Sequence, residues 1–291
     1  MQAVTIRSGP LVAEIAPRLG AGMLRFECDG VPLFRGTGAD AQGMDLASII
    51  LVPWSNRISG GGFNFEGRFH ALAPNVPGET YPIHGNGFQL PWTVTAATGD
   101  AVELALESEG PNPYIYVARM RYALTNDALS MELTVTNRAV IRLPFGLGFH
   151  PYLARTPDTE IRADFGQVWL ETADHLPAAL VDISARPDWN FRQGKALPAD
   201  WINNAFPGWD GRALVTWPSR HLTLAIEASA ALSCAILYSP SKTAESFCLE
   251  PVTHAVDAIN GPGGAEANDM AVLDAGESQT VSCRFRVGDA Q

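Results

Sequence analysis

The stretch that decides the fold is LSMELTVT, residues 129–136. Its Leu, Met, Leu and Val alternate with Ser, Glu, Thr and Thr, so an extended chain here has one apolar and one polar face. This period of two is typical of a half-buried β-strand. Just upstream, residues 119–124 predict the partner strand, and the TNDA sequence at 125–128 predicts the turn between the two.

The same alternation recurs along the chain, whereas helical periodicity is scarce and neither a tandem repeat nor a low-complexity linker is visible. The dipeptide Asp29-Gly30 predicts a hairpin turn between strands at 22–28 and 31–34. Further strands are predicted at residues 102–107, 222–227, 231–238, 247–250 and 280–287. We therefore expect an all-β chain that forms a single large antiparallel β-sandwich over residues 1–291, with very little helix. Two smaller β domains are the alternative.

The composition restricts the partners. The chain has 291 residues, of which 46% are hydrophobic and 18% charged, and its net charge is −11. Nucleic-acid binding depends on clustered Lys and Arg, so a chain this acidic is a poor candidate for it. An acidic membrane surface would repel it for the same reason. We expect a small-molecule partner, neutral rather than polyanionic, with no nucleic acid and no membrane.

The sequence also bears on the compartment. The N-terminal residues show no basic region followed by an apolar one, which disfavours a secretory signal. No run approaches the roughly 20 apolar residues that span a bilayer. None of the four cysteines forms a Cys-x-x-Cys pair, so buried free thiols are expected rather than a zinc or redox site. These features favour a cytoplasmic protein.

Two loop-like segments carry polar groups that β propensity does not explain. In PWSNRI, residues 53–58, Arg57 follows an apolar run. It either presents its rigid fork of donors to hydroxyls or a carboxylate, or is an ordinary surface charge. In YPIHGNG, residues 81–87, His84 lies where a scaffold usually displays binding groups. A loop histidine that bonds a nearby carbonyl is the alternative.

A third segment, GFHPY at residues 148–152, places His150 directly before Pro151. The residue before a proline favours an extended backbone, and proline lacks a ladder N–H, so we expect the strand to stop or bend at His150. Partial burial beside aromatic side chains brings a histidine into the range for proton transfer at neutral pH. A structural histidine bonded to a backbone carbonyl is the alternative.

The fourth segment is SFCLEPVTH, residues 246–254, in which Glu250 ends an apolar run before a proline. The same argument predicts that Glu250 stands at the end of a core strand. A carboxylate there is costly unless it is paired, and such placement raises a pKa for acid–base work. An ion pair with Arg57 is the structural alternative. His254 and Asp257 follow as candidates for supporting the site.

Other kinds of site lack their signatures. No two of the six histidines are spaced three or four residues apart, and His-x-His is absent, so metal binding is disfavoured. A zinc site assembled from distant strands is the remaining alternative. No Gly-x-Gly-x-x-Gly motif opens a helix and no Gly-x-Ser-x-Gly elbow is present, which disfavours a dinucleotide site and a serine hydrolase.

At these four segments the chain resembles the aldose 1-epimerase (galactose mutarotase) family. The matching motifs are NRI at 56–58, GF at 62–63, Gly67, HG at 84–85, Trp92, GFHPY at 148–152, EPVTH at 250–254, Asp257, Ala258 and Asn260. Each is short, but their order and number make coincidence improbable. The resemblance implies a single-domain sandwich of the galactose mutarotase type with an open groove for a sugar, and no metal or organic cofactor.

The resemblance also implies residue roles. Glu250 resembles the family's general base and His150 its general acid. His84 resembles the second active-site histidine, and Arg57, with Asn56 beside it, the group that binds sugar oxygens.

One position departs from the family pattern. The family usually has an Asp in an Asp-x-x-Phe segment that holds sugar hydroxyls, and here INNAF at residues 202–206 places Asn203 there. An amide still binds hydroxyls, but it adds donors and lacks the charge. Asp210 is a candidate to compensate, although turn chemistry explains it equally well.

The sequence therefore predicts an isomerase that interconverts the α and β anomers of a free aldose, as a monomer or homodimer. A hexose-phosphate mutarotase is one alternative, although no Lys or Arg cluster supports it. A non-catalytic sugar-binding protein is another. A glycosidase needs paired carboxylates, and only Glu250 is a convincing candidate.

Overall fold

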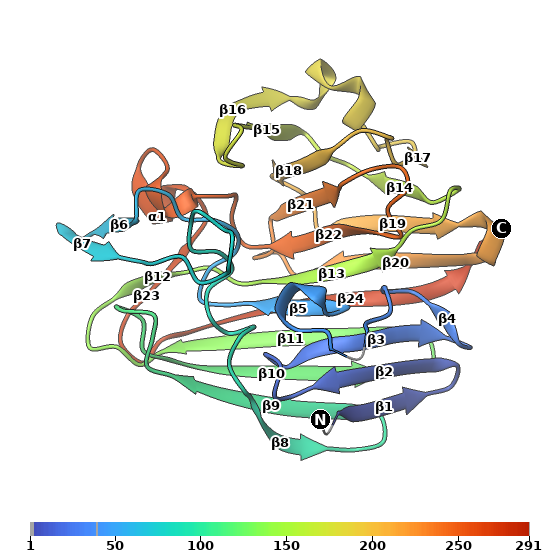
Figure 1. Cartoon of the computed structure of the whole chain (residues 1–291), viewed down its shortest axis with the longest axis horizontal. Coiled ribbons are helices and arrows are strands. Elements are labelled where there is room, and N and C mark those ends of the chain that lie inside the picture. Colours follow the sequence, from blue (N-terminus) through green and yellow to red (C-terminus); the bar gives the residue numbers. More distant parts are fainter. Residues whose placement is uncertain (1–2, 39, 291) are drawn as a thin grey trace.

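The computed structural model describes residues 3–38 and 40–290 and contains two nine-stranded antiparallel sheets (Figure 1). The first sheet has the order β1 (Val4–Ser8), β2 (Leu11–Ala16), β3 (Gly22–Cys28), β5 (Ser48–Leu51), β13 (Gly148–Ala154), β22 (Ser246–Val252), β21 (Cys234–Ser239) and β18 (Ile202–Pro207), with β4 (Val31–Pro32) paired to β3. The second has the order β17 (Lys195–Ala196), β14 (Glu160–Ala163), β19 (Arg212–Trp217), β20 (Leu222–Ala228), β24 (Ser278–Asp289), β11 (Ala128–Asn137), β10 (Tyr116–Leu124), β9 (Ala101–Ser108) and β8 (Thr93–Ala97).

Smaller elements project from these sheets. Three two-stranded ribbons pair β12 (Leu143–Phe145) with β23 (Ala271–Leu273), β15 (Gln167–Glu171) with β16 (Pro177–Asp182), and β6 (Gly62–Phe65) with β7 (Arg68–Ala71). The helices are α1 (Gly264–Ala267) and the 3-10 turns η1 (Gly43–Asp45), η2 (Ile183–Ala185), η3 (Pro187–Trp189), η4 (Pro218–Arg220) and η5 (Ala258–Asn260). The expected all-β sandwich with very little helix is confirmed. None of the helices within residues 3–38 and 40–290 has the length and apolar character needed to cross a membrane.

The stretch at residues 129–136 forms most of β11, as predicted. Its Leu, Met, Leu and Val side chains are buried, whereas the intervening residues are partly or fully exposed. β10 is its predicted partner, with Leu124 opposite Leu129. The predicted strand at 231–238 begins later, at Cys234, and β4 is shorter than expected. The four cysteines are free and buried, which confirms that prediction.

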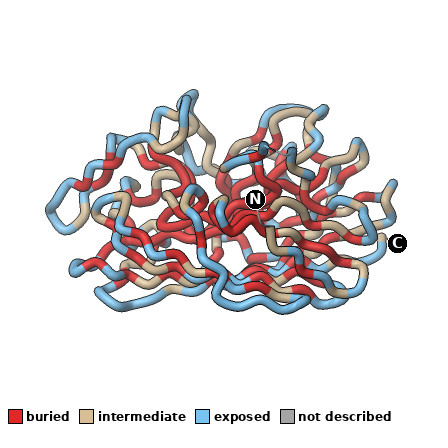
Figure 2. The backbone as a smooth tube through the Cα atoms, turned by 60° about the horizontal axis from the view of Figure 1, so that its bottom comes forward, coloured by how far each residue is buried: buried red, intermediate tan, exposed pale blue. Residues whose placement is uncertain are grey.

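The two sheets share one apolar core, which Figure 2 shows as buried backbone between exposed outer loops. Phe34, just after β4, joins them. Its ring lies 5.2 Å from that of Phe26 in the first sheet and 5.3 Å from that of Phe285 in the second. Because neither sheet can bury its apolar face alone, this shared core supports the single-domain interpretation, which stays a prediction.

One prediction was wrong. The strands do not end at His150 and Glu250, because β13 continues through Pro151 and β22 through Pro251. The ladder between these two fully described strands pairs Gly148 with Val252, then resumes at Tyr152 with Cys248. Both prolines lie in this interrupted stretch, where they have no N–H to donate, and each pairs with its other neighbour, Pro151 with Ser48 and Pro251 with Ala235. The register on either side of the interruption sets His150 opposite Glu250 in mid-strand.

The inter-sheet role of Phe34 is testable. Phe34→Ala should lower the free energy of unfolding by about 3–5 kcal/mol, because it removes a fully buried ring and leaves a cavity. Urea titration measures this. Phe69→Ala is the matched control, since Phe69 is 51% exposed in β7 and its loss should cost less than about 0.5 kcal/mol. Equal effects of the two substitutions would contradict the assignment.

Candidate active site

A cavity of about 630 Å³ opens over the middle strands of the first sheet. This volume suits a small organic ligand. Its walls come from β13, β22, β18 and β21, from the loops around residues 56 and 79–84, and from the β15–β16 turn. Six residues singled out from the sequence line it: Asn56, Arg57, His84, His150, Asn203 and Glu250.

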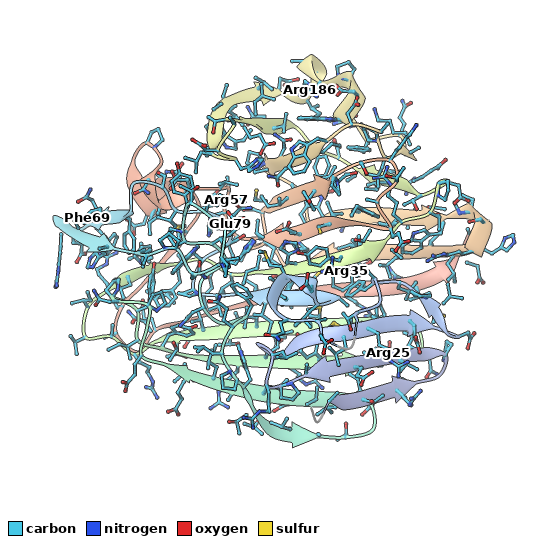
Figure 3. The ribbon with its side chains drawn as sticks, viewed as in Figure 1. Arg25, Arg35, Arg57, Phe69, Glu79 and Arg186 are labelled. Atoms are coloured by element: carbon cyan, nitrogen blue, oxygen red, sulfur yellow. The ribbon has the colours of Figure 1, made fainter. Side chains whose placement is uncertain are left out.

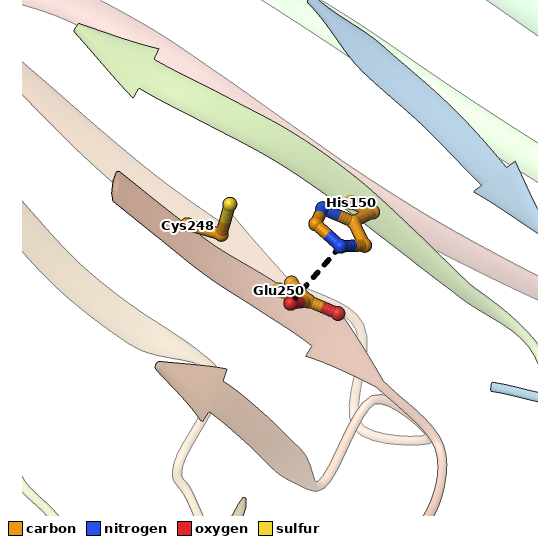
Figure 4. Close-up of side chains that lie close together, drawn as sticks. All are labelled: His150, Cys248 and Glu250. Atoms are coloured by element: carbon orange, nitrogen blue, oxygen red, sulfur yellow. Dashed lines mark ion pairs between the residues drawn. The ribbon is translucent and has the colours of Figure 1, made fainter. Parts of the chain in front are cut away.

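The floor of the cavity carries His150 and Glu250. Nε2 of His150 lies 3.3 Å from Oε1 of Glu250, and the two side chains face each other from neighbouring strands (Figure 4). The residues are only 5% and 2% exposed. Nδ1 of His150 and Oε2 of Glu250 are buried without a hydrogen-bond partner in the described chain. The pair therefore retains bonding capacity that a bound molecule can use.

Burial sets the protonation of this pair. Desolvation raises the pKa of Glu250 well above its usual range. Desolvation, helped by the positive charge of Arg35, lowers the pKa of His150 to about 3. Both shifts favour the uncharged form, so burial favours a neutral His150 beside a protonated Glu250. The pair is best treated as one unit that holds a single mobile proton.

His84 is held as a neutral donor. Its Nδ1 accepts a hydrogen bond of 3.0 Å from the backbone N–H of Asn56. The backbone N–H of His84 in turn donates to the Asn56 carbonyl at 3.0 Å. Because Nδ1 is an acceptor, the ring proton is on Nε2. Burial lowers the pKa of His84 well below its usual value, and the ring lies 5.2 Å from that of His150. Asn56 thus positions this histidine through its backbone.

Arg57 pairs with Glu79, which the sequence analysis missed. Its Nε and Nη2 each donate to the Glu79 carboxylate at 3.0 Å. Figure 3 shows the two side chains next to each other. Arg57 therefore pairs with Glu79 and not with Glu250, which was the alternative considered from the sequence. The positive charge of Arg57 still opposes the rise in the pKa of Glu250. Glu79 stands alone in a loop, so no motif identified it.

Asn203 lies at the opposite wall, bonded to a second carboxylate that sequence reasoning missed. Its Nδ2 donates to Oε2 of Glu171 at 3.1 Å. The same carboxylate accepts from Nε1 of Trp201 at 2.7 Å and lies 2.8 Å from Nδ1 of His175. Glu171 uses one of the two N–H donors of Nδ2, so the second N–H and the amide oxygen of Asn203 are left for a ligand.

Asp210 does not belong to this group. It lies outside the cavity, and its Oδ1 accepts the backbone N–H of Arg212 at 2.9 Å. Turn formation accounts for it. Glu171 is the group that supplies a carboxylate near Asn203.

His254 and Asp257 form hydrogen bonds to residues on either side of Arg57. Nε2 of His254 accepts the Ser55 N–H at 3.3 Å, and Asp257 accepts the N–H and hydroxyl of Ser59 at 2.9 and 2.6 Å. Neither lines the cavity. Both contact residues close to Arg57 in sequence, and their supporting role stays a prediction.

One group of side chains in the described chain has the composition of a metal site. The ligand atoms of His150, Cys248 and Glu250 all lie within 4.8 Å of one another (Figure 4). Burial raises the pKa of Cys248 well above its usual value. Because the thiolate and not the thiol is the metal ligand, a metal would have to displace this proton before it could bind.

Comparison with known proteins places this geometry in context. The model of the aldose 1-epimerase family matches residues 2–286. The uncharacterized protein YphB of Escherichia coli K12 is 31% identical over 99% of both chains. A crystal structure of an Escherichia coli K12 protein proposed to be an aldose 1-epimerase superposes with a TM-score of 0.93, at 31% identity and 99% coverage of both chains.

A galactose mutarotase-like protein from Clostridium acetobutylicum shares the fold at 17% identity, with a TM-score of 0.86 over 99% of this chain and 95% of that one. The sandwich, the buried His–Glu pair and the family match over nearly the whole length agree with one another. The chain belongs to the aldose 1-epimerase family.

Proposed function

We propose that the protein is a mutarotase that interconverts the α and β anomers of an aldose with a free C1 hydroxyl. One observation carries this proposal: Nε2 of His150 lies 3.3 Å from Oε1 of Glu250 on the floor of a cavity large enough for a sugar. In a cyclic aldose the C1 hydroxyl and the ring oxygen are both bonded to C1. Two proton-transfer groups a few ångströms apart therefore reach both oxygens at once.

The reaction needs proton transfers only. Glu250 removes the proton of the C1 hydroxyl while His150 protonates the ring oxygen, so the bond from C1 to that oxygen breaks and a C1 carbonyl forms. Rotation about the C1–C2 bond presents the other face of the carbonyl. Reclosure then returns one proton from Glu250 to the new C1 hydroxyl and one from the ring-oxygen hydroxyl to His150. Each group contributes roughly 10²–10⁴-fold.

The resting protonation fits this cycle after one proton moves. Catalysis in this direction needs Glu250 ionised and His150 protonated, which differs from the neutral pair only by one proton transferred across 3.3 Å. Sugar hydroxyls that donate to the unpartnered Oε2 of Glu250 would stabilise the carboxylate. His84, through Nε2–H, and Arg57 would hold further sugar oxygens, and the half-exposed Trp201 offers a stacking surface.

The direct test is exchange spectroscopy by NMR on glucose, galactose, xylose and arabinose. We expect faster exchange between anomers of at least one sugar. Saturable binding without faster exchange would instead identify a sugar-binding protein. No effect on any aldose would reject the proposal.

Glu250→Gln should lower kcat by at least about 10²-fold, because the amide cannot accept the C1 proton. The fold should persist, since an uncharged amide replaces a buried carboxyl. Exchange rates and thermal unfolding measure the two effects. Glu227→Gln, an exposed glutamate in β20, is the control and should keep full activity. Near-normal turnover of Glu250→Gln would remove this residue as the base.

The pH profile of kcat/KM should be flat through pH 6.5, the ordinary pKa of histidine. The pair takes up a second proton only when His150 is protonated, and burial lowers the pKa of His150 to about 3, so this protonation occurs far below pH 6.5. At the alkaline end the pair loses its proton only above the usual range of Glu, because burial raises the pKa of Glu250. Initial rates at low sugar concentration report this profile. A half-maximal point near 6.5 would contradict the shared-proton description.

Glu79→Gln should raise KM by about 10-fold and change kcat by less than about 3-fold. The substitution removes one side of a two-point ion pair, so Arg57 loses its fixed orientation. Saturation curves separate the two constants. Glu227→Gln again serves as the control, because it removes an exposed Glu–Arg pair on β20. A loss confined to kcat would place Arg57 in the chemical step instead.

A further inference from the structure

Arg35 forms the outer layer of a stack that begins at the catalytic pair. Tyr152 stacks on His150, with ring centres 4.6 Å apart and planes inclined by 22°. The Arg35 guanidinium carbon lies 3.5 Å from the centre of the Tyr152 ring. The backbone N–H of Arg35 also donates to the Tyr152 carbonyl at 2.7 Å. The guanidinium is therefore held two layers from His150, where it lines the cavity.

In the part of the chain that the structure describes, the charge of Arg35 has no counter-ion. Nε and Nη2 donate to the Leu46 carbonyl at 3.1 and 2.9 Å, and Nη2 also donates to the Met44 carbonyl. These acceptors are neutral. Within residues 3–38 and 40–290, no carboxylate lies within ion-pair distance of Arg35, and Nη1 has no hydrogen-bond partner. Arg57, by contrast, is neutralised by Glu79 at the other side of the cavity (Figure 3).

The other charged groups of the cavity do not compensate Arg35. The lining carboxylates are those of Glu79, Asp174 and Glu250. Glu79 is paired with Arg57, and Glu250 shares its proton with His150. Asp174 belongs to the β15–β16 turn, next to the residues that hold Asn203. The hydroxyl-bearing residues Tyr238 and Ser246 line the cavity as well and add neutral donors.

The chemistry of the sugar ring relates Arg35 to one position of the substrate. The ring oxygen of an aldohexose is bonded to C1 and C5, and C5 carries C6. If His150 protonates the ring oxygen while Glu250 meets the C1 hydroxyl, the C6 substituent leaves the ring on the His150 side. That is the side on which Tyr152 stacks on His150 and the Arg35 guanidinium lies over Tyr152.

We propose that Arg35 is an anion-binding subsite and that the preferred aldose carries a negatively charged group at C6, either a carboxylate or a phosphate. The proposal rests on the proposed mutarotase function and specifies its substrate class. The net charge of −11 does not oppose it, because screening limits distant surface charges to about 10 Å, whereas Arg35 lines the site itself. Carboxylates and phosphates bind well to a guanidinium whose N–H groups have no other hydrogen-bond partner.

The test compares glucose, glucuronate and glucose 6-phosphate by NMR exchange. In the unmodified protein kcat/KM should be at least about 10-fold higher for one of the anionic sugars than for glucose. Preference for glucuronate alone identifies a carboxylate, and preference for glucose 6-phosphate alone a phosphate. The advantage should shrink when NaCl is raised to about 0.5 M, while the value for glucose stays constant.

Arg35→Gln should lower kcat/KM for the preferred anionic sugar by about 10–100-fold and that for glucose by less than about 3-fold. Arg35→Lys should retain part of the preference, because the charge remains. Arg25→Gln is the matched control: Arg25 lies in β3 away from the cavity, bound to Glu14 and Glu27, and its loss should leave all three values unchanged (Figure 3).

The outcomes separate the two proposals. Equal losses for all three sugars in Arg35→Gln would make Arg35 a structural residue and overturn the anion subsite. A preference of the unmodified protein for glucose over both anionic sugars would also overturn the anion subsite. This comparison needs no variant, so it remains decisive even if Arg35→Gln fails to fold. No acceleration of any sugar would overturn the mutarotase function, and the subsite with it.

Discussion

The structure depends on the burial of two ionisable groups that face each other. His150 and Glu250 are almost inaccessible to water, so both are forced toward their uncharged forms and share one proton. They meet where the ladder between β13 and β22 is interrupted, at two prolines that cannot donate to it. The neighbouring strands of the first sheet and the loops around the cavity enclose this pair and supply the remaining polar groups. A surface-exposed pair would have the usual pKa values and could not hold its proton in common over a wide pH range.

The cavity around the pair is electrostatically uneven. Arg57 is neutralised by Glu79 on one wall, whereas on the other wall Asn203 is oriented by the Glu171 carboxylate. Among the described residues that line the cavity, Arg35 is the arginine whose side-chain partners are backbone carbonyls. A chain of net charge −11 thus presents a local positive centre close to His150 and Glu250. Net charge describes the long-range field, which salt screens, whereas the contacts at a binding site depend on which charges are already paired.

Much of this could be predicted from the sequence, and the failures have specific causes. Period-two alternation at residues 129–136 identified β11 because solvent exposure alternates along a strand. The strand ends expected at His150 and Glu250 were wrong, because a proline in a sheet is tolerated where the ladder is already open. Glu79, Glu171 and Arg35 were missed because their side chains contact residues distant in the chain. Asn203 and Asp210 were both candidates, and only their positions in space separate them.

The sequence by itself determined the sandwich class and identified six of the polar residues that line the cavity. Alternation and turn residues are local signals, and the motifs around His84, His150 and Glu250 are short and contiguous. The tertiary structure alone decided which charges are compensated and where protons rest. The pKa of Glu250 follows from the depth of its burial, and the open charge of Arg35 from the absence of a carboxylate near it in the described chain. Both are properties of packing between segments far apart in sequence, because desolvation and ion pairing depend on distance in space and not on position along the chain.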